Sequence, residues 1–210
     1  MTTPATLERR RFADELAQVG PDAPTLCKGW DAKDLAAHVI LRESRPDAAI
    51  GVVTPFLSGY AGKVQGKIAD REFSSLVDDI RSGPPIWWPT RIDTLDRLAN
   101  TTEFFVHLED LRRAKPDWEP RELDPELEAD LAGALKRMAK LFARKAPAGV
   151  VLVPDGGAEI VAKNADPTVR VSGPVGELVL WIFGRQAHSR VEYDGPADAV
   201  AALAEASFGI

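Results

Sequence analysis

The sequence has one cysteine, Cys27, among its 210 residues. An intrachain disulfide is therefore excluded, which fits a reducing compartment. No stretch approaches the roughly 18 apolar residues of a membrane-spanning helix, so we expect no membrane segment. An excess of basic residues is also lacking, because 26 Lys and Arg against 32 Asp and Glu give a net charge of -6. Proteins that bind nucleic acid usually carry a basic face, so nucleic acid is not expected as a partner.

The start of the sequence lacks the features of a targeting segment. Arginines at positions 9–11 are followed by Asp14 and Glu15, where a signal peptide would need an unbroken apolar run. The remaining composition is ordinary for a globular protein, with 45% hydrophobic and 28% charged residues. We therefore expect a cytoplasmic protein with an adequate core.

Apolar residues recur at helical spacing through the first two thirds of the chain. This spacing predicts helices over about 4–18, 31–44, 92–114 and 125–145, with a shorter helix near 60–80. Asp31 can cap the second of these, and Asp34 suits the positive end of its dipole. The run SGPPIWWP cannot form a regular helix. Its Trp87 and Trp88 are expected to pack back on the core or to wall a pocket.

The pattern of residues changes from helix-like to strand-like after Ala148. Short β-branched runs between turn residues predict strands in GVVLVPDG, AEIVAKN, TVRVSG and SRVEYDG. GELVLWIFGR is typical of a buried helix, and ADAVAALAEAS predicts a last helix. The expected fold class is α+β, with a helical domain over residues 1–147 and a small α+β domain over 148–210.

The clearest chemical signal is the pair Glu103 and His107. Four helical steps place these side chains on one face, about 5–6 Å apart at Cβ, which suits two ligands of one metal. Glu103 and Asp110 also fall on the stripe of apolar residues that we expect to face the core, formed by Ile92, Leu95, Ala99 and Val106. Carboxylates there are costly unless they are paired or metal-bound, so this stripe predicts a cation.

His38 on the second helix is the candidate third ligand. Two histidines and one carboxylate leave positions open for water or substrate, as in catalytic zinc sites, and the same set suits iron or nickel. Asp110 is expected to orient His107 from behind the ligands. The alternatives are a buried Glu103 paired with Arg42, and a His38 that is simply a satisfied core histidine. Cys27 is expected to be a small core or loop residue.

These residues lie in segments that resemble a known family. LCKGWDAKDLAAHVILRE (26–43) resembles the C-x-GW-x3-DL-x2-H signature of the mycothiol-dependent maleylpyruvate isomerase family, within the DinB-like superfamily. EFFVHLEDL (103–111) resembles its E-x3-H-x2-DL signature. VRVSGPVGELVLWIFGR (169–185) resembles the family's small, sterol-carrier-like α+β domain. The sequence is most similar to an actinobacterial subgroup of metal-binding proteins of unassigned function.

The resemblance implies a four-helix bundle that binds a divalent metal, usually zinc, through His38, Glu103 and His107. It also implies a substrate-binding role for Arg185, and mycothiol as the co-substrate. The metal would favour the thiolate form of mycothiol, which adds to a small electrophile and leads to isomerisation or thiol transfer. The alternative is a non-catalytic ligand-binding or regulatory module with a structural metal. The sequence does not predict the oligomeric state.

Overall fold

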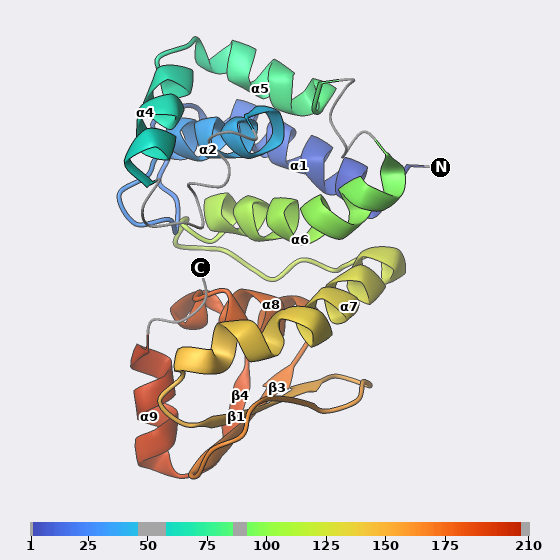
Figure 1. Cartoon of the computed structure of the whole chain (residues 1–210), viewed down its shortest axis with the longest axis vertical. Coiled ribbons are helices and arrows are strands. Elements are labelled where there is room, and N and C mark those ends of the chain that lie inside the picture. The colour runs from blue at the N-terminus through green and yellow to red at the C-terminus, as the bar shows by residue number, and fades with distance from the viewer. Residues whose placement is uncertain (1, 46–57, 86–91, 207–210) are drawn as a thin grey trace. The chain divides into compact units, whose positions relative to one another are not determined.

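The computed structural model describes residues 2–45, 58–85 and 92–206 (Figure 1). The chain divides into two compact units, Met1–Glu119 and Pro120–Ile210. The first is helical in its described part, and the second contains a four-stranded sheet. The α+β fold class is therefore confirmed, whereas Trp87 and Trp88 lie outside the described residues. No described helix has both the length and the apolar character needed to cross a membrane.

The described helices of the first unit lie close to their predicted positions, with one exception. They are α1 (Pro4–Val19), α2 (Ala32–Ser44), α4 (Ser58–Ala69), α5 (Phe73–Ser82) and α6 (Asp93–Arg112). The single helix predicted near residues 60–80 is in fact two helices, α4 and α5. The break lets α4 pack on α2 while α5 packs on both α1 and α2, which one straight helix could not do.

Local sequence determines where α2 begins. Asp31 Oδ1 accepts a hydrogen bond from the backbone N–H of Asp34 at 2.8 Å. The Asp34 carboxylate accepts in return from the N–H of Asp31 at 3.5 Å, which completes a capping box. The predicted N-cap is confirmed, and it sets where α2 begins.

The core of the first unit is built by α1, α2, α5 and α6, and α1 packs against both α5 and α6. The apolar stripe predicted for α6 is wrong in its first half. Ile92 and Leu95 are 58% and 42% exposed, whereas Asp96 and Asn100 are buried. The reason is that these two polar side chains pair with buried charged groups of α1 and α2. Asp110, in the second half, is buried as predicted.

The second unit combines α7 (Pro125–Phe142), a four-stranded sheet, α8 (Val175–Ile182) and α9 (Ala197–Glu205). The strands are β1 (Gly149–Pro154), β2 (Ile160–Lys163), β3 (Thr168–Gly173) and β4 (Glu192–Asp194), in the order β2-β1-β3-β4. The pair β1–β3 is parallel, and the outer pairs are antiparallel. Every residue of α8 is buried, which fits a sequence that is apolar apart from Glu177.

The division between the units precedes α7 instead of following residue 147. The helix predicted as the fourth of the bundle is present, but it packs on α8 and β2 of the second unit (Figure 1). Its buried stripe of Leu127, Leu131 and Leu135 has the predicted spacing. Helical spacing identifies such a stripe but does not specify which neighbour covers it.

Candidate metal centre

The loop that precedes α2 is tied to the C-terminal half of α6. The backbone N–H of Leu26 donates to the carbonyl oxygen of Asp110 at 3.1 Å. The next side chain, Cys27, places its Sγ 3.2 Å from Asp110 Oδ2, with the thiol as donor. This loop therefore supplies one of the groups that surround the Asp110 carboxylate.

The same loop covers the face of His38. The N–H of Trp30 donates to the carbonyl of Cys27 at 3.0 Å, and Gly29, with φ 81°, permits this tight turn. The turn brings the Trp30 ring against the His38 ring, with centroids 4.9 Å apart. The GW dipeptide thus has a structural explanation, because the glycine allows the turn and the tryptophan shields the histidine.

His107 is oriented by Asp110, as the sequence suggested. Its Nδ1 lies 3.0 Å from Asp110 Oδ2, and the Asp110 carboxylate is fully buried. A carboxylate partner places the ring proton on Nδ1, so that Nε2 can face a ligand. Burial lowers the pKa of His107, but contacts with Asp110, Cys27 and Glu103 outweigh it and raise the pKa well above its usual value. A metal ion at Nε2 would therefore displace a proton.

Glu103 extends toward Nε2 of His107 from the preceding turn of α6. The distance from Glu103 Oε2 to His107 Nε2 is 3.6 Å. This is too long for a hydrogen bond. It is close to the roughly 3.4 Å between two ligand atoms of a tetrahedral zinc ion with bonds of about 2.0–2.2 Å. The spacing suits a cation bound by both side chains.

The charge state of Glu103 also suits a cation. Burial raises the pKa of this carboxyl group, but the His107 ring and the positive charge of Arg42 outweigh burial and lower the pKa to about 2. The Arg42 Nε lies 3.5 Å from Glu103 Oε2, so the ion pair weighed as an alternative is present. Pairing with Arg42 and binding of a metal are compatible, because a carboxylate offers several lone pairs.

His38 completes the cluster from α2. Its ring meets that of His107 edge-on, with centroids 5.4 Å apart and an interplanar angle of 80°. Burial, and then the charge of His107, lower the pKa of His38 to about 3, so the ring is neutral as a metal ligand must be. Its Nδ1 is buried and has no hydrogen-bond partner within the described part of the chain. A buried nitrogen without a partner is uncommon and fits a ligand position.

The structure thus brings His38, Glu103 and His107 into one cluster, with Asp110 behind His107. Arg185 belongs to the second unit. Its Nη1 donates to the carbonyl of Phe183 at 2.6 Å, which helps to close the end of α8. A substrate-binding role for Arg185 stays a prediction.

Cys27 is the residue whose surroundings the sequence did not reveal. One ligand atom from each of Cys27, His107 and Asp110 lies within 4.8 Å of the other two, and among the described residues this is the one group of three whose ligand atoms lie so close. The only available signal was that Cys27 and the helix of Asp110 both lie in the family-like segments. Spacing along the chain does not show that the two segments meet.

Comparison with known proteins fits this arrangement. Residues 3–52 match the family model described as the mycothiol maleylpyruvate isomerase N-terminal domain. This stretch of the chain is similar to that domain. The match includes the segment that carries Cys27, Trp30 and His38, whereas the metal-binding subgroup suggested by the sequence is not tested by it. No curated protein matches the chain significantly.

Solved structures of mycothiol-dependent maleylpyruvate isomerase are similar in fold to this chain, and the similarity includes residues of both units. The crystal structure of that enzyme aligns with a TM-score of 0.62 at 15% identity, covering 91% of this chain and 90% of that chain. The structure of a histidine-to-alanine variant aligns with a TM-score of 0.61 at 14% identity and the same coverage. At this identity the alignments establish the shared fold and do not transfer the reaction.

Proposed function

We propose that this protein binds one divalent metal ion through His38, Glu103 and His107 and uses the site to hold a small thiol. The observation that carries the proposal is the 3.6 Å separation of His107 Nε2 and Glu103 Oε2. Beside it lies the buried Nδ1 of His38, which has no hydrogen-bond partner among the residues that the structure describes. Three ligand residues leave at least one coordination position open, which is the pattern of a catalytic site. Zinc suits this donor set best, and iron and nickel are alternatives.

Each residue around the cluster has a distinct part in this proposal. The carboxylate of Asp110 holds the proton on His107 Nδ1, which leaves Nε2 for the metal. Trp30 covers the His38 ring and limits the access of water to it. The bound metal would supply positive charge that favours a thiolate over a thiol.

The thiol is mycothiol and the reaction is an isomerisation or a thiol transfer, as the family name and the shared fold suggest. The thiolate sulfur adds to an electrophilic carbon of a small unsaturated substrate, and the C=C electron pair moves onto the adjoining carbonyl group. Rotation about the new single bond and loss of the thiolate return an isomer. If the adduct is protonated at carbon instead, the thiol has been transferred. Arg185 binds a substrate carboxylate in this proposal, as a charged fork.

The group formed by Cys27, His107 and Asp110 is the competing metal site. Both Cys27 and His107 already place donors at Asp110 Oδ2, at 3.2 and 3.0 Å. These hydrogen bonds satisfy the polar atoms of this group without a metal. By contrast, a cation would fill the gap between Glu103 and His107 and would give the buried nitrogen of His38 a partner. We therefore assign the group around Asp110 to orienting His107.

Isothermal titration calorimetry with mycothiol tests the proposal. The zinc-loaded protein is expected to bind mycothiol, whereas the metal-free protein and His107→Ala are expected to show at least a hundredfold weaker binding. His188→Ala is the matched control, because it removes a histidine of the second unit and should leave binding unchanged. Mycothiol binding that survives in the metal-free protein would contradict the mechanism. Zinc binding without any thiol binding would favour the non-catalytic module.

A further inference from the structure

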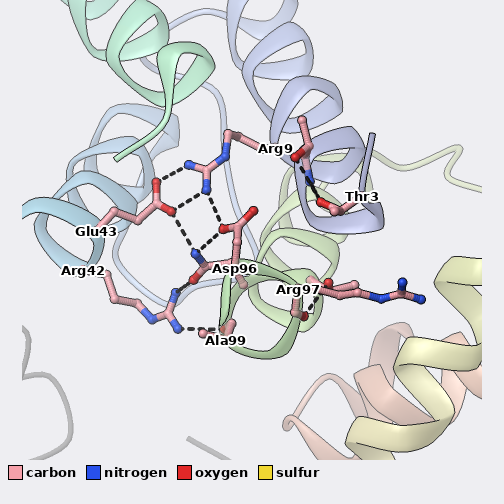
Figure 2. Close-up of polar contacts among 10 residues, drawn as sticks. Thr3, Arg9, Arg42, Glu43, Asp96, Arg97 and Ala99 are labelled. Atoms are coloured by element: carbon pink, nitrogen blue, oxygen red, sulfur yellow. Dashed lines mark hydrogen bonds and ion pairs between the residues drawn. The ribbon is translucent and has the colours of Figure 1, made fainter. Parts of the chain in front are cut away.

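A buried ionic network lies beside the candidate metal centre and is not part of it. Figure 2 shows Arg9 of α1 directed at two carboxylates, Glu43 of α2 and Asp96 of α6. Its Nη2 lies 2.7 Å from Glu43 Oε1 and 2.9 Å from Asp96 Oδ1, and its Nη1 donates to Glu43 Oε2. The three residues are 4%, 5% and 6% exposed. The network therefore fixes three helices against one another.

Asn100 extends this network toward the surface. Its Nδ2 donates to Glu43 Oε1 at 3.1 Å and to Asp96 Oδ1 at 2.7 Å. The only other polar atom of the side chain, Oδ1, accepts from Arg42 Nη1 at 3.2 Å. Both ends of the amide are thus engaged, which fixes its orientation and makes Asn100 the link between the buried network and Arg42.

Arg42 is held at both of its terminal nitrogens. While Nη1 donates to Asn100, Nη2 donates to the carbonyl of Ala99 at 3.2 Å (Figure 2). The rigid guanidinium plane then leaves Nε facing Glu103 Oε2 at 3.5 Å. This oxygen is the one that lies 3.6 Å from His107 Nε2. A continuous path of contacts therefore joins buried Arg9 to the carboxylate of the candidate metal centre.

We infer that Arg42 is a positioning residue for Glu103 and that Asn100 holds Arg42 in place. The inference rests on the proposed metal site. Glu103 is a long side chain with three rotatable bonds, and its side chain is 24% exposed, so its carboxylate needs a partner to hold it toward His107. Arg42 provides that partner from a fixed position, and the geometry of the guanidinium matters more than its charge.

Lysine at position 42 separates geometry from charge. A lysine keeps the positive charge but has one nitrogen in place of the three that contact Asn100, Ala99 and Glu103. It cannot hold its own position and contact Glu103 at once. If charge alone mattered, the Arg42→Lys variant would behave as the parent protein does. In that case, removal of the charge in Arg42→Met would strengthen the binding of a cation.

The experiment measures Co²⁺ affinity by competition with a chelator, together with the visible absorption spectrum of bound Co²⁺, which reports its ligand geometry. We expect Arg42→Lys and Arg42→Met each to bind at least tenfold more weakly, in the range typical for residues that support metal ligands, with a changed spectrum. Arg71→Lys is the control, since Arg71 forms an exposed ion pair with Asp79 on α5. Its affinity and spectrum should match those of the parent protein.

The outcomes separate this inference from the proposal on which it rests. If the parent protein binds no Co²⁺, the metal site itself fails. If the parent binds Co²⁺ while Arg42→Lys keeps both the affinity and the spectrum, the role of Arg42 is overturned. Tighter binding by Arg42→Met would also overturn it, because Arg42 would then act only as a competing cation. Circular dichroism of each metal-free variant checks that the helices are retained.

Discussion

Two polar clusters lie side by side in the first unit and are built on opposite plans. In the cluster around Arg9, donors and acceptors meet at hydrogen-bond distances such as 2.7 and 2.9 Å. In the cluster around His107, Glu103 Oε2 lies 3.5 and 3.6 Å from its cationic neighbours, and His38 Nδ1 has no partner among the described residues. The first cluster is closed, and the second has longer separations, which the proposed metal ion would fill.

The distances between polar atoms distinguish a structural cluster from a candidate functional one better than the types of residue do. Both clusters contain buried acids next to a cation, and both would be costly if left unpaired. The closed cluster satisfies itself, so its role is to hold α1, α2 and α6 together. The open cluster has a spacing that suits metal ligands, and in the proposed function a bound ion would satisfy its groups to the same degree.

Breaking the closed cluster should cause the largest loss of stability. Arg9→Met leaves the Glu43 and Asp96 carboxylates without their buried cation, and we expect a loss of about 3–5 kcal/mol in the free energy of unfolding. Urea denaturation measures it. Arg81→Met, which removes exposed ion pairs to Asp14 and Asp78, should cost less than about 1 kcal/mol. Equal losses in both variants would mean that the closed cluster has no special structural role.

Binding of zinc to the open cluster should stabilise the protein. Zinc at about one hundred times its dissociation constant is expected to add about 2.7 kcal/mol. Glu103→Gln should lose this gain, because it removes the anionic ligand. Glu72→Gln, an exposed acid at the start of α5, should retain it. Denaturation with and without zinc gives both values, and an equal gain in Glu103→Gln would argue against the assigned ligand.

Changing the group behind His107 should weaken the site without removing a ligand. Asp110→Asn is expected to lower zinc affinity about 10–100-fold, because the amide no longer fixes the proton on Nδ1. Cys27→Ser retains the carboxylate and should change the affinity less than about threefold. Chelator competition measures both. Complete loss of binding in both variants would mean that Cys27 and Asp110 are themselves ligands.

The smallest expected effect is a pH dependence of the metal-free protein. His38 has its pKa lowered to about 3, so the unfolded state binds the extra proton as pH falls below about 6.5, and stability decreases. His107 has a raised pKa, so its contribution is present below about 6.5 and is lost as pH rises toward the folded pKa.

These two histidines together predict a stability maximum near pH 6.5, with slopes of at most about 1.4 kcal/mol per pH unit. Denaturation of the metal-free protein between pH 5 and 8 measures the profile. His38→Gln should flatten the acid side, and His107→Gln the alkaline side. An unchanged acid side in His38→Gln would show that His38 is already protonated in the folded protein.

The helices, the strands and the shared helical face of Glu103 and His107 could be predicted from the sequence because each rests on local information. The capping residues around Asp31 and the four-residue spacing of Glu103 and His107 are properties of single helices. What the sequence could not show is the contact between helices. The apolar residues of α6 suggested the wrong buried face in its first half, since Asp96 and Asn100 are buried by partners on α1 and α2.

The same limit explains the contacts around the site that could not be predicted from the sequence. Cys27 precedes Asp110 by 83 positions, and Arg42 precedes Asn100 by 58, so only the folded chain brings each pair together. The grouping of α7 with the sheet is a third example, because a regular leucine stripe does not specify which surface it packs on.

The most direct test of the proposed metal site is the metal content of the purified protein. Elemental analysis is performed on the parent chain and on His107→Ala, both after reconstitution with zinc and removal of excess metal. We expect about one zinc per chain in the parent and none in the variant, with both proteins folded by circular dichroism. A folded parent chain that takes up no zinc, iron or nickel would contradict the proposed metal site, and the open cluster would then be a buried polar group completed by Arg42.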